Sequence, residues 1–256
     1  MPSKLPDFFY YIFDPSLPRL GPGDTASTLR ALSTFTQHHS QLANKEIRIL
    51  DVGCGNGAPT IQLAKHLNGS ILATDNHQPY LDELMRRAHT AHVADQVSVL
   101  LADMAELRVE NETFDLIWSE GALSIMGFRN GLQAMRSLLK QDGIMAVSEI
   151  VWFVPDPPKE VHDFLAPVCP LMTDVASNLQ MITDCGYHVL DHFTLPDSSW
   201  LDEYYAPLEA RLREVRITHT CDPTESAIIG AMETEIALFR KYMGSYGYEF
   251  FVMQKN

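Results

Sequence analysis

The sequence of 256 residues has few basic side chains, no internal repeats and no long apolar run. Its 19 lysines and arginines are outnumbered by 33 acidic residues, and the net charge of −14 disfavours nucleic acid and acidic membranes as partners. No apolar stretch is long enough to span a bilayer, and the N-terminus lacks the basic start and cleavage site of a signal peptide. We therefore expect a cytoplasmic protein with neither nucleic acid nor membrane as partner.

Cysteine is scarce as well. The four cysteines have no Cys-x-x-Cys spacing, which argues against a disulfide framework and a zinc site (Cys54, Cys169, Cys185 and Cys221). No histidine pair is accompanied by a third ligand at a spacing typical of metal sites. We expect reduced thiols and no metal.

What the sequence does contain is a regular alternation of β-rich runs and amphipathic stretches from residue 44 to residue 151. This pattern predicts βα units around a parallel sheet. The expected strands are Ile47–Asp51, Ser70–Asp75, Val97–Leu101, Phe114–Trp118 and Gly143–Val151. The expected helices between them are Pro59–Leu67, Pro79–His89 and Asn130–Leu139.

The pattern loosens after Pro155, where helices dominate. We expect helices over Thr173–Cys185, Ser198–Arg216 and Asp222–Met243, and strands over Tyr187–Leu195 and Tyr246–Gln254. The last helix has the best-defined start, since an aspartate cap, a first-turn proline and a glutamate follow one another at residues 222–225. Pro207 predicts a break near Tyr204 and Tyr205, where exposed aromatics would line a pocket.

A glycine-rich turn follows the first strand directly, with the sequence Asp51-Val52-Gly53-Cys54-Gly55-Asn56-Gly57. Glycines permit a sharp turn from strand to helix and let the backbone approach a ligand closely. A second acid, Asp75, ends the next strand, where a carboxylate can accept both hydroxyls of a ribose. Asp103 and Met104 follow the third strand and suit the amino group and the face of an adenine.

Two adenosine cofactors fit this turn. Gly53, Gly55 and Ala58 match the nicotinamide dinucleotide fingerprint G-x-G-x-x-A. The second cofactor is S-adenosylmethionine, and Asp51 favours it. The carboxylate of Asp51 would repel a pyrophosphate but suit the ammonium and sulfonium groups of S-adenosylmethionine.

Four ordered motifs between residues 46 and 151 resemble those of class I S-adenosylmethionine-dependent methyltransferases. They are the glycine turn, Asp75, the segment Leu101–Met104 and the segment Phe114–Gly121. The resemblance implies a Rossmann-like α/β fold, whose mostly parallel sheet has seven strands and a reversed last strand. The connection before that strand, residues 196–245, departs from the usual short hairpin and predicts a helical insertion. A looser similarity links the chain to small-molecule methyltransferases related to quinone-pathway enzymes.

The resemblance also assigns site residues and a domain division. Asp51, Gly53, Cys54 and Gly55 would hold the amino-acid end of the cofactor; Asp75 and Asn76 the ribose, Asp103 and Met104 the adenine, and Glu120 the methionine moiety or the transferred methyl group. Residues 1–43 would form a helical lid, with apolar positions at Leu29, Leu32 and Phe35, over a methyltransferase domain at 44–256.

The function we expect is methyl transfer from S-adenosylmethionine to a small molecule that the sequence leaves unidentified. A general base is needed only where the acceptor must lose a proton. Glu120 is the first candidate for such a base, followed by Glu149, His188 and Tyr204. The alternatives are a non-catalytic S-adenosylmethionine-binding protein and an NAD-dependent oxidoreductase. The sequence also leaves the oligomeric state open, a homodimer included.

Overall fold

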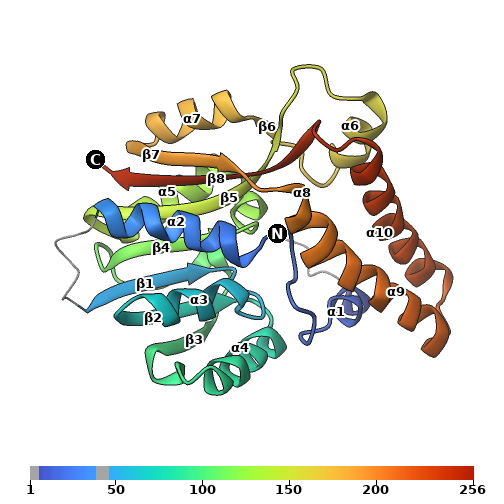
Figure 1. Cartoon of the computed structure of the whole chain (residues 1–256), viewed down its shortest axis with the longest axis horizontal. Coiled ribbons are helices and arrows are strands. Elements are labelled where there is room, and N and C mark those ends of the chain that lie inside the picture. Colours follow the sequence, from blue (N-terminus) through green and yellow to red (C-terminus); the bar gives the residue numbers. More distant parts are fainter. Residues whose placement is uncertain (1–5, 39–45) are drawn as a thin grey trace.

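A mixed sheet forms the centre of the computed structural model, which describes residues 6–38 and 46–256 (Figure 1). The strand order is β3-β2-β1-β4-β5-β8-β7, and β8 is antiparallel to both of its neighbours. The strands are β1 (Ile47–Val52), β2 (Gly69–Asp75), β3 (Val97–Leu101), β4 (Phe114–Glu120), β5 (Leu139–Trp152), β6 (Thr173–Asp174), β7 (Tyr187–Thr194) and β8 (Tyr246–Lys255). The expected α/β fold with a reversed last strand is confirmed.

The described part of the sheet has eight strands, whereas the sequence predicted seven. The additional strand, β6, is only two residues long and pairs with the end of β5, where Val151 faces Thr173 and Trp152 faces Asp174. So short a pairing carries no hydrophobic alternation that a sequence pattern could reveal.

Helices cover both faces of the sheet. On one face lie α2 (Thr25–His38), α3 (Ala58–His66) and α4 (Gln78–Thr90), and on the other α5 (Phe128–Leu138) and α7 (Val175–Asp184). Adjacent residues of β1 serve opposite faces, since Ile49 packs with Leu63 of α3, whereas Leu50 packs with Leu132 of α5. β1 is therefore a central strand that is buried on both faces at every residue except Arg48.

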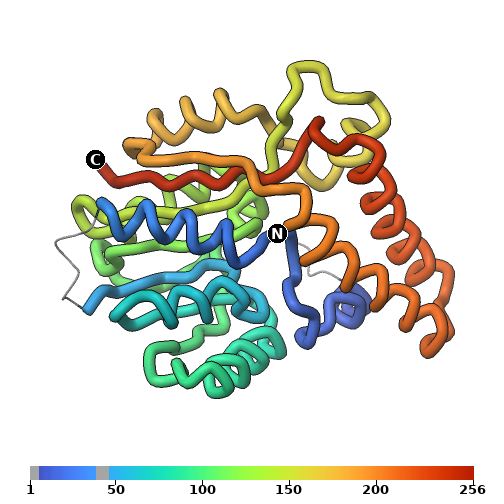
Figure 2. Tube along the Cα trace, in the orientation of Figure 1, coloured from blue at the N-terminus to red at the C-terminus, as the bar shows by residue number. Residues whose placement is uncertain are grey.

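A group of helices stands beyond the edge where the parallel strands end (Figure 1). It comprises α1 (Asp7–Ile12), α6 (Lys159–Leu165), α8 (Asp197–Trp200), the π-helical turn η5 (Leu201–Tyr205), α9 (Ala206–Thr218) and α10 (Pro223–Lys241). Buried aromatic side chains join these helices in a third core, with Trp200 stacked on Phe239 at a centroid distance of 4.6 Å. Figure 2 shows the N-terminal segment beside α9, where Arg211 donates a hydrogen bond to the carbonyl of Tyr11.

The described residues also form three short 3-10 turns, namely η2 (Ala94–Gln96), η3 (Met104–Glu106) and η4 (Leu123–Met126). Helices α8 to α10 lie between β7 and β8, within the range expected for the insertion. The expected boundary between residues 43 and 44 lies outside the described residues.

The expectation of an exposed helix break at Pro207 is wrong. Pro207 lies in the first turn of α9, and the helical path continues back through η5. A π-helical turn rearranges the backbone hydrogen bonds, so the helix continues although Pro207 has no amide to donate. Tyr204 and Tyr205 are consequently buried in the third core, and neither lines a pocket described below.

The capping box of α10 provides a test of the helical group. The side chain of Asp222 accepts a hydrogen bond from the amide of Glu225, and the side chain of Glu225 accepts one from the amide of Asp222. Asp222→Ala should lower the free energy of unfolding by about 1 kcal/mol, measured by urea denaturation. Asp222→Ser retains an acceptor and should stay close to the parent; equal losses in both variants would contradict the capping role.

Candidate functional site

The glycine turn follows β1 with a backbone that only glycine adopts readily. Gly53, Gly55 and Gly57 have φ angles of +68°, +52° and +83°. The amide of Gly53 donates a hydrogen bond to the carbonyl of Thr74 at 2.9 Å, which fixes the turn against β2. A Cβ atom on Gly53 would lie 2.5 Å from the Cβ of Ala122, so a side chain there would collide with the loop after β4.

Two aspartates flank this turn. Asp51 is 1% exposed, and its Oδ2 accepts a hydrogen bond of 2.6 Å from the hydroxyl of Thr60. Burial, together with the nearby carboxylates of Glu120 and Asp75, raises the pKa of Asp51 to about 7. Burial also raises the pKa of Asp75, although its oxygens accept hydrogen bonds from the amides of His77 and Gly55. A cation bound beside Asp51 and Asp75 would stabilise the ionised form of both carboxylates.

Two cavities meet at the turn, and Gly53, Asp75 and Ala122 line both of them. The turn cavity, of about 170 Å³, is lined among others by Asp51, Gly53, Cys54, Gly55, Asp75 and Glu120. The adjoining cavity, of about 560 Å³, is lined among others by Gly53, Asp75, Asn76, Asp103 and Met104. The structure thus brings every residue assigned to the cofactor from the sequence to one continuous cleft.

Residues 49–143, which include the whole glycine turn and both aspartates, match the family model described as a methyltransferase domain. The match covers somewhat more than a third of the chain, so this segment is similar to a methyltransferase domain. The strand order, with its reversed last strand, is the one that the sequence resemblance implies.

Among curated proteins, a sterol 24-C-methyltransferase of Gibberella zeae is 23% identical over 66% of this chain. The chain spans about half of that protein, since the match covers 47% of it. A methyltransferase of Geobacter sulfurreducens, solved with S-adenosyl-L-homocysteine, superposes with a TM-score of 0.81 at 19% identity, over 99% of each chain. The [4+2]-cyclase SpnF superposes with a TM-score of 0.70 at 17% identity, over 92% of this chain and 83% of its own. At such identities the structures establish a shared fold.

The glycine turn is covered by residues 13–24, which we call the strap. Asn56, within the turn, donates hydrogen bonds to the carbonyls of Pro15 and Leu17 at 3.1 and 2.6 Å. Leu20 approaches the turn so closely that a Cβ on Gly55 would lie 3.2 Å from its side chain. These contacts hold the strap over the turn cavity, and the strap lies within residues 1–43, for which the sequence predicts a helical lid.

Glu120 binds the strap and the helix that follows it. Its Oε2 accepts a hydrogen bond from Arg19 at 3.0 Å, and its Oε1 accepts from the hydroxyl of Thr28 at 2.8 Å and the indole of Trp118 at 3.0 Å. Three donors, one of them a guanidinium, favour a role in anchoring over one as a general base. Nothing in the sequence pattern singled out Arg19, whose place in the site depends on the fold of the strap.

The remaining candidates for a base lie in different surroundings. Tyr204 is buried among aromatic rings, and burial raises its pKa well above the ordinary value, so it is a poor proton acceptor. His188 is exposed on β7. Glu149 of β5 is 5% exposed, and burial raises its pKa to about 8. It lines a third cavity that shares Ile125 and Met126 with the adjoining cavity.

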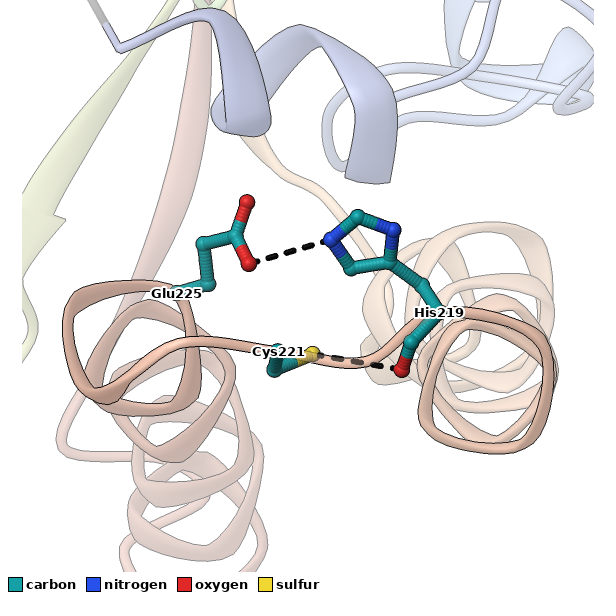
Figure 3. A group of neighbouring side chains, drawn as sticks. All are labelled: His219, Cys221 and Glu225. Carbon is teal, nitrogen blue, oxygen red and sulfur yellow. Dashed lines mark hydrogen bonds and ion pairs between the residues drawn. The ribbon is translucent and has the colours of Figure 1, made fainter.

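One group of described side chains has the composition of a metal site, namely His219, Cys221 and Glu225 (Figure 3). Its potential ligand atoms lie within 4.8 Å of one another. Each already has a protein partner, because His219 pairs with Glu225 at 3.0 Å, Glu225 also caps α10, and the thiol of Cys221 points to the carbonyl of His219. We interpret the group as a brace between α9 and α10.

Glu149 should make stability depend on pH. Its pKa in the folded protein, about 8, exceeds the ordinary value of 4.5, so the unfolded chain releases this proton first as the pH rises. The contribution of Glu149 to stability is therefore fully present below pH 4.5 and is lost as the pH rises through 8. Glu149→Gln cannot titrate and should gain melting temperature relative to the parent between pH 5 and pH 8. Melting temperatures are measured by circular dichroism at several pH values. A constant difference between parent and variant across that range would show that the pKa of Glu149 is not raised.

Proposed function

We propose that this protein transfers a methyl group from S-adenosylmethionine to a small-molecule acceptor. The observation that carries the proposal is the continuous cleft at the carboxyl ends of β1, β2 and β3, into which three strand-end aspartates are gathered. Such a crevice is where open α/β sheets bind their ligands. The match of residues 49–143 to a methyltransferase domain supports the same conclusion.

The residues of the cleft fit the parts of this cofactor. Asp51 would face the cationic methionine end in the turn cavity, where Gly53 and Gly55 leave room for it. Asp75 would accept hydrogen bonds from the ribose, with Asn76 beside it. Asp103 would accept a hydrogen bond from the adenine amino group, and Met104 would pack on the ring.

The protein's part in the reaction is to bind, orient and exclude water. S-adenosylmethionine supplies an electrophilic methyl group, so no strong acid or metal is required of the protein. The strap shields the turn cavity, and it is held there by the hydrogen bond from Arg19 to Glu120 and by that from Thr28, in the helix that follows the strap, to the same carboxylate. Exclusion of water raises the strength of the charge interactions inside the cleft and removes a competing nucleophile.

The acceptor is proposed to be a small molecule, in keeping with the sterol methyltransferase among the relatives. Among the described residues, no helix has the length and apolar character needed to cross a membrane. The four cysteines are free, which supports a reducing compartment such as the cytoplasm. Formation of S-adenosylhomocysteine in the presence of a panel of small acceptors tests the activity directly.

A second candidate function is another reaction on the same fold, because a [4+2]-cyclase superposes over most of this chain. Fold alone does not decide the chemistry. Binding of S-adenosylmethionine without any release of S-adenosylhomocysteine, across a broad panel of acceptors, would favour that alternative or a non-catalytic role.

Asp75→Ala should weaken binding of S-adenosylhomocysteine by roughly tenfold or more, because two ribose hydroxyls lose their acceptor. Isothermal titration calorimetry measures the change. Asp82→Ala removes an exposed carboxylate from α4 and serves as the control. An unchanged affinity in Asp75→Ala would contradict the ribose assignment, and protection of the parent by NAD in place of S-adenosylhomocysteine would contradict the cofactor.

Binding of S-adenosylmethionine should strengthen with pH. Because the pKa of Asp51 is about 7 before the ligand binds, more of the protein carries the carboxylate at pH 7.5 than at pH 6. We expect a several-fold gain in affinity across this range, measured by calorimetry. Asp51→Asn should bind more weakly and show little of the gain; the same gain in the variant would assign the titration to another group.

A further inference from the structure

The third cavity, which we call the Glu149 cavity, is lined in part by η4 and lies beside the proposed cofactor cleft. Its volume is about 410 Å³, at the lower end of the roughly 300–1,000 Å³ typical of small-molecule sites. Its walls come from Ser124–Phe128, Glu149–Ile150, Val168–Thr173 and Asn178. Most of these side chains are apolar, and none of them is a lysine, arginine or histidine. A compact apolar molecule fits such a space.

The carboxyl group of Glu149 is unusual among the buried acids of the described chain. Its side chain is 5% exposed, and its Oε2 has no hydrogen-bond partner. The neighbouring Glu249, directly across from it on β8, accepts hydrogen bonds from His192 and Thr194 at 2.6 and 2.7 Å. Asp115, also buried, is bound by Lys140 at 2.8 Å. The backbone amide of Ile150 stabilises the carboxylate in part, but Oε2 has no donor. Burial of a carboxyl oxygen without a donor is costly, so its presence on a cavity wall points to a partner that is not part of the chain.

We propose that the Glu149 cavity binds a compact apolar molecule that carries an amine, and that the protonated amine pairs with Glu149. An ammonium group supplies the donors that Oε2 lacks, and the apolar walls would take up the hydrocarbon part. The cavity shares Ile125 and Met126 with the adjoining cavity, so its occupant lies next to the cofactor cleft. The proposal concerns binding and stands independently of methyl transfer.

Cyclohexylmethylamine is a suitable probe, and cyclohexylmethanol is its uncharged counterpart of similar size. In calorimetric titrations of the full chain, the amine should bind and the alcohol should bind roughly tenfold or more weakly. Glu149→Gln should weaken binding of the amine by a similar factor, whereas Glu203→Gln, at an exposed acid of η5, should leave it unchanged. No binding of the amine, equal affinities for the two probes, or an unchanged affinity in Glu149→Gln would overturn the proposal.

A second measurement uses the parent protein alone. Cys169 lines the Glu149 cavity, whereas Cys221 lies in the connection between α9 and α10. Bound amine should slow alkylation of Cys169 by N-ethylmaleimide several-fold and leave Cys221 unaffected, as followed by peptide mass spectrometry. Equal slowing at both cysteines, or none, would contradict the site. Binding of S-adenosylhomocysteine, measured on the same samples, reports separately on the proposed cofactor cleft.

Discussion

The structure depends on the burial of an acidic side chain at the end of its central strand. Asp51 belongs to β1, which lies between β2 and β4 in the middle of the sheet. Its carboxylate is buried and accepts a hydrogen bond from the hydroxyl of Thr60, and the carboxylates of Glu120 and Asp75 lie nearby. Burial of this kind destabilises the ionised form of the carboxyl group, and a cationic ligand stabilises that form again. A cationic ligand in the turn cavity, as proposed, accounts for the burial of this acid.

The same cleft explains why the chain places its N-terminal segment where it does. The strap adds no strand to the described sheet, and three of its carbonyls accept hydrogen bonds from side chains. Arg87 donates to the carbonyls of Pro15, Leu17 and Pro18, and Asn56 donates to two of the same three. These donors come from the glycine turn and from α4, which follows β2. Closure of the cleft is consequently coupled to the correct fold of the elements that form it.

Much of this arrangement could be predicted from the sequence, because hydrophobic periodicity and glycine chemistry act locally. The spacing of the glycines predicts a sharp turn from strand to helix. Asp75 and Asp103 lie at or just after the ends of strands whose carboxyl ends must share one edge of a parallel sheet. The contacts of the strap could not be predicted, since Arg19 meets Glu120 across 101 positions of the chain. The predicted helix break at Pro207 was wrong for a related reason. A π-helical turn, stabilised by tertiary packing, lets the helix continue although proline has no backbone amide to donate.

The arrangement of charge also separates the competing cofactors. Asp51, Asp75 and Glu120 all line the turn cavity, and Arg19, the one basic residue in its wall, is already paired with Glu120. A pyrophosphate at the glycine turn would bring negative charge next to two carboxylates in a medium where water screens them poorly. A sulfonium with an ammonium group reverses the sign of that interaction. A dinucleotide and S-adenosylmethionine would make similar contacts through their adenosine, so it is the acids around the turn that discriminate between them.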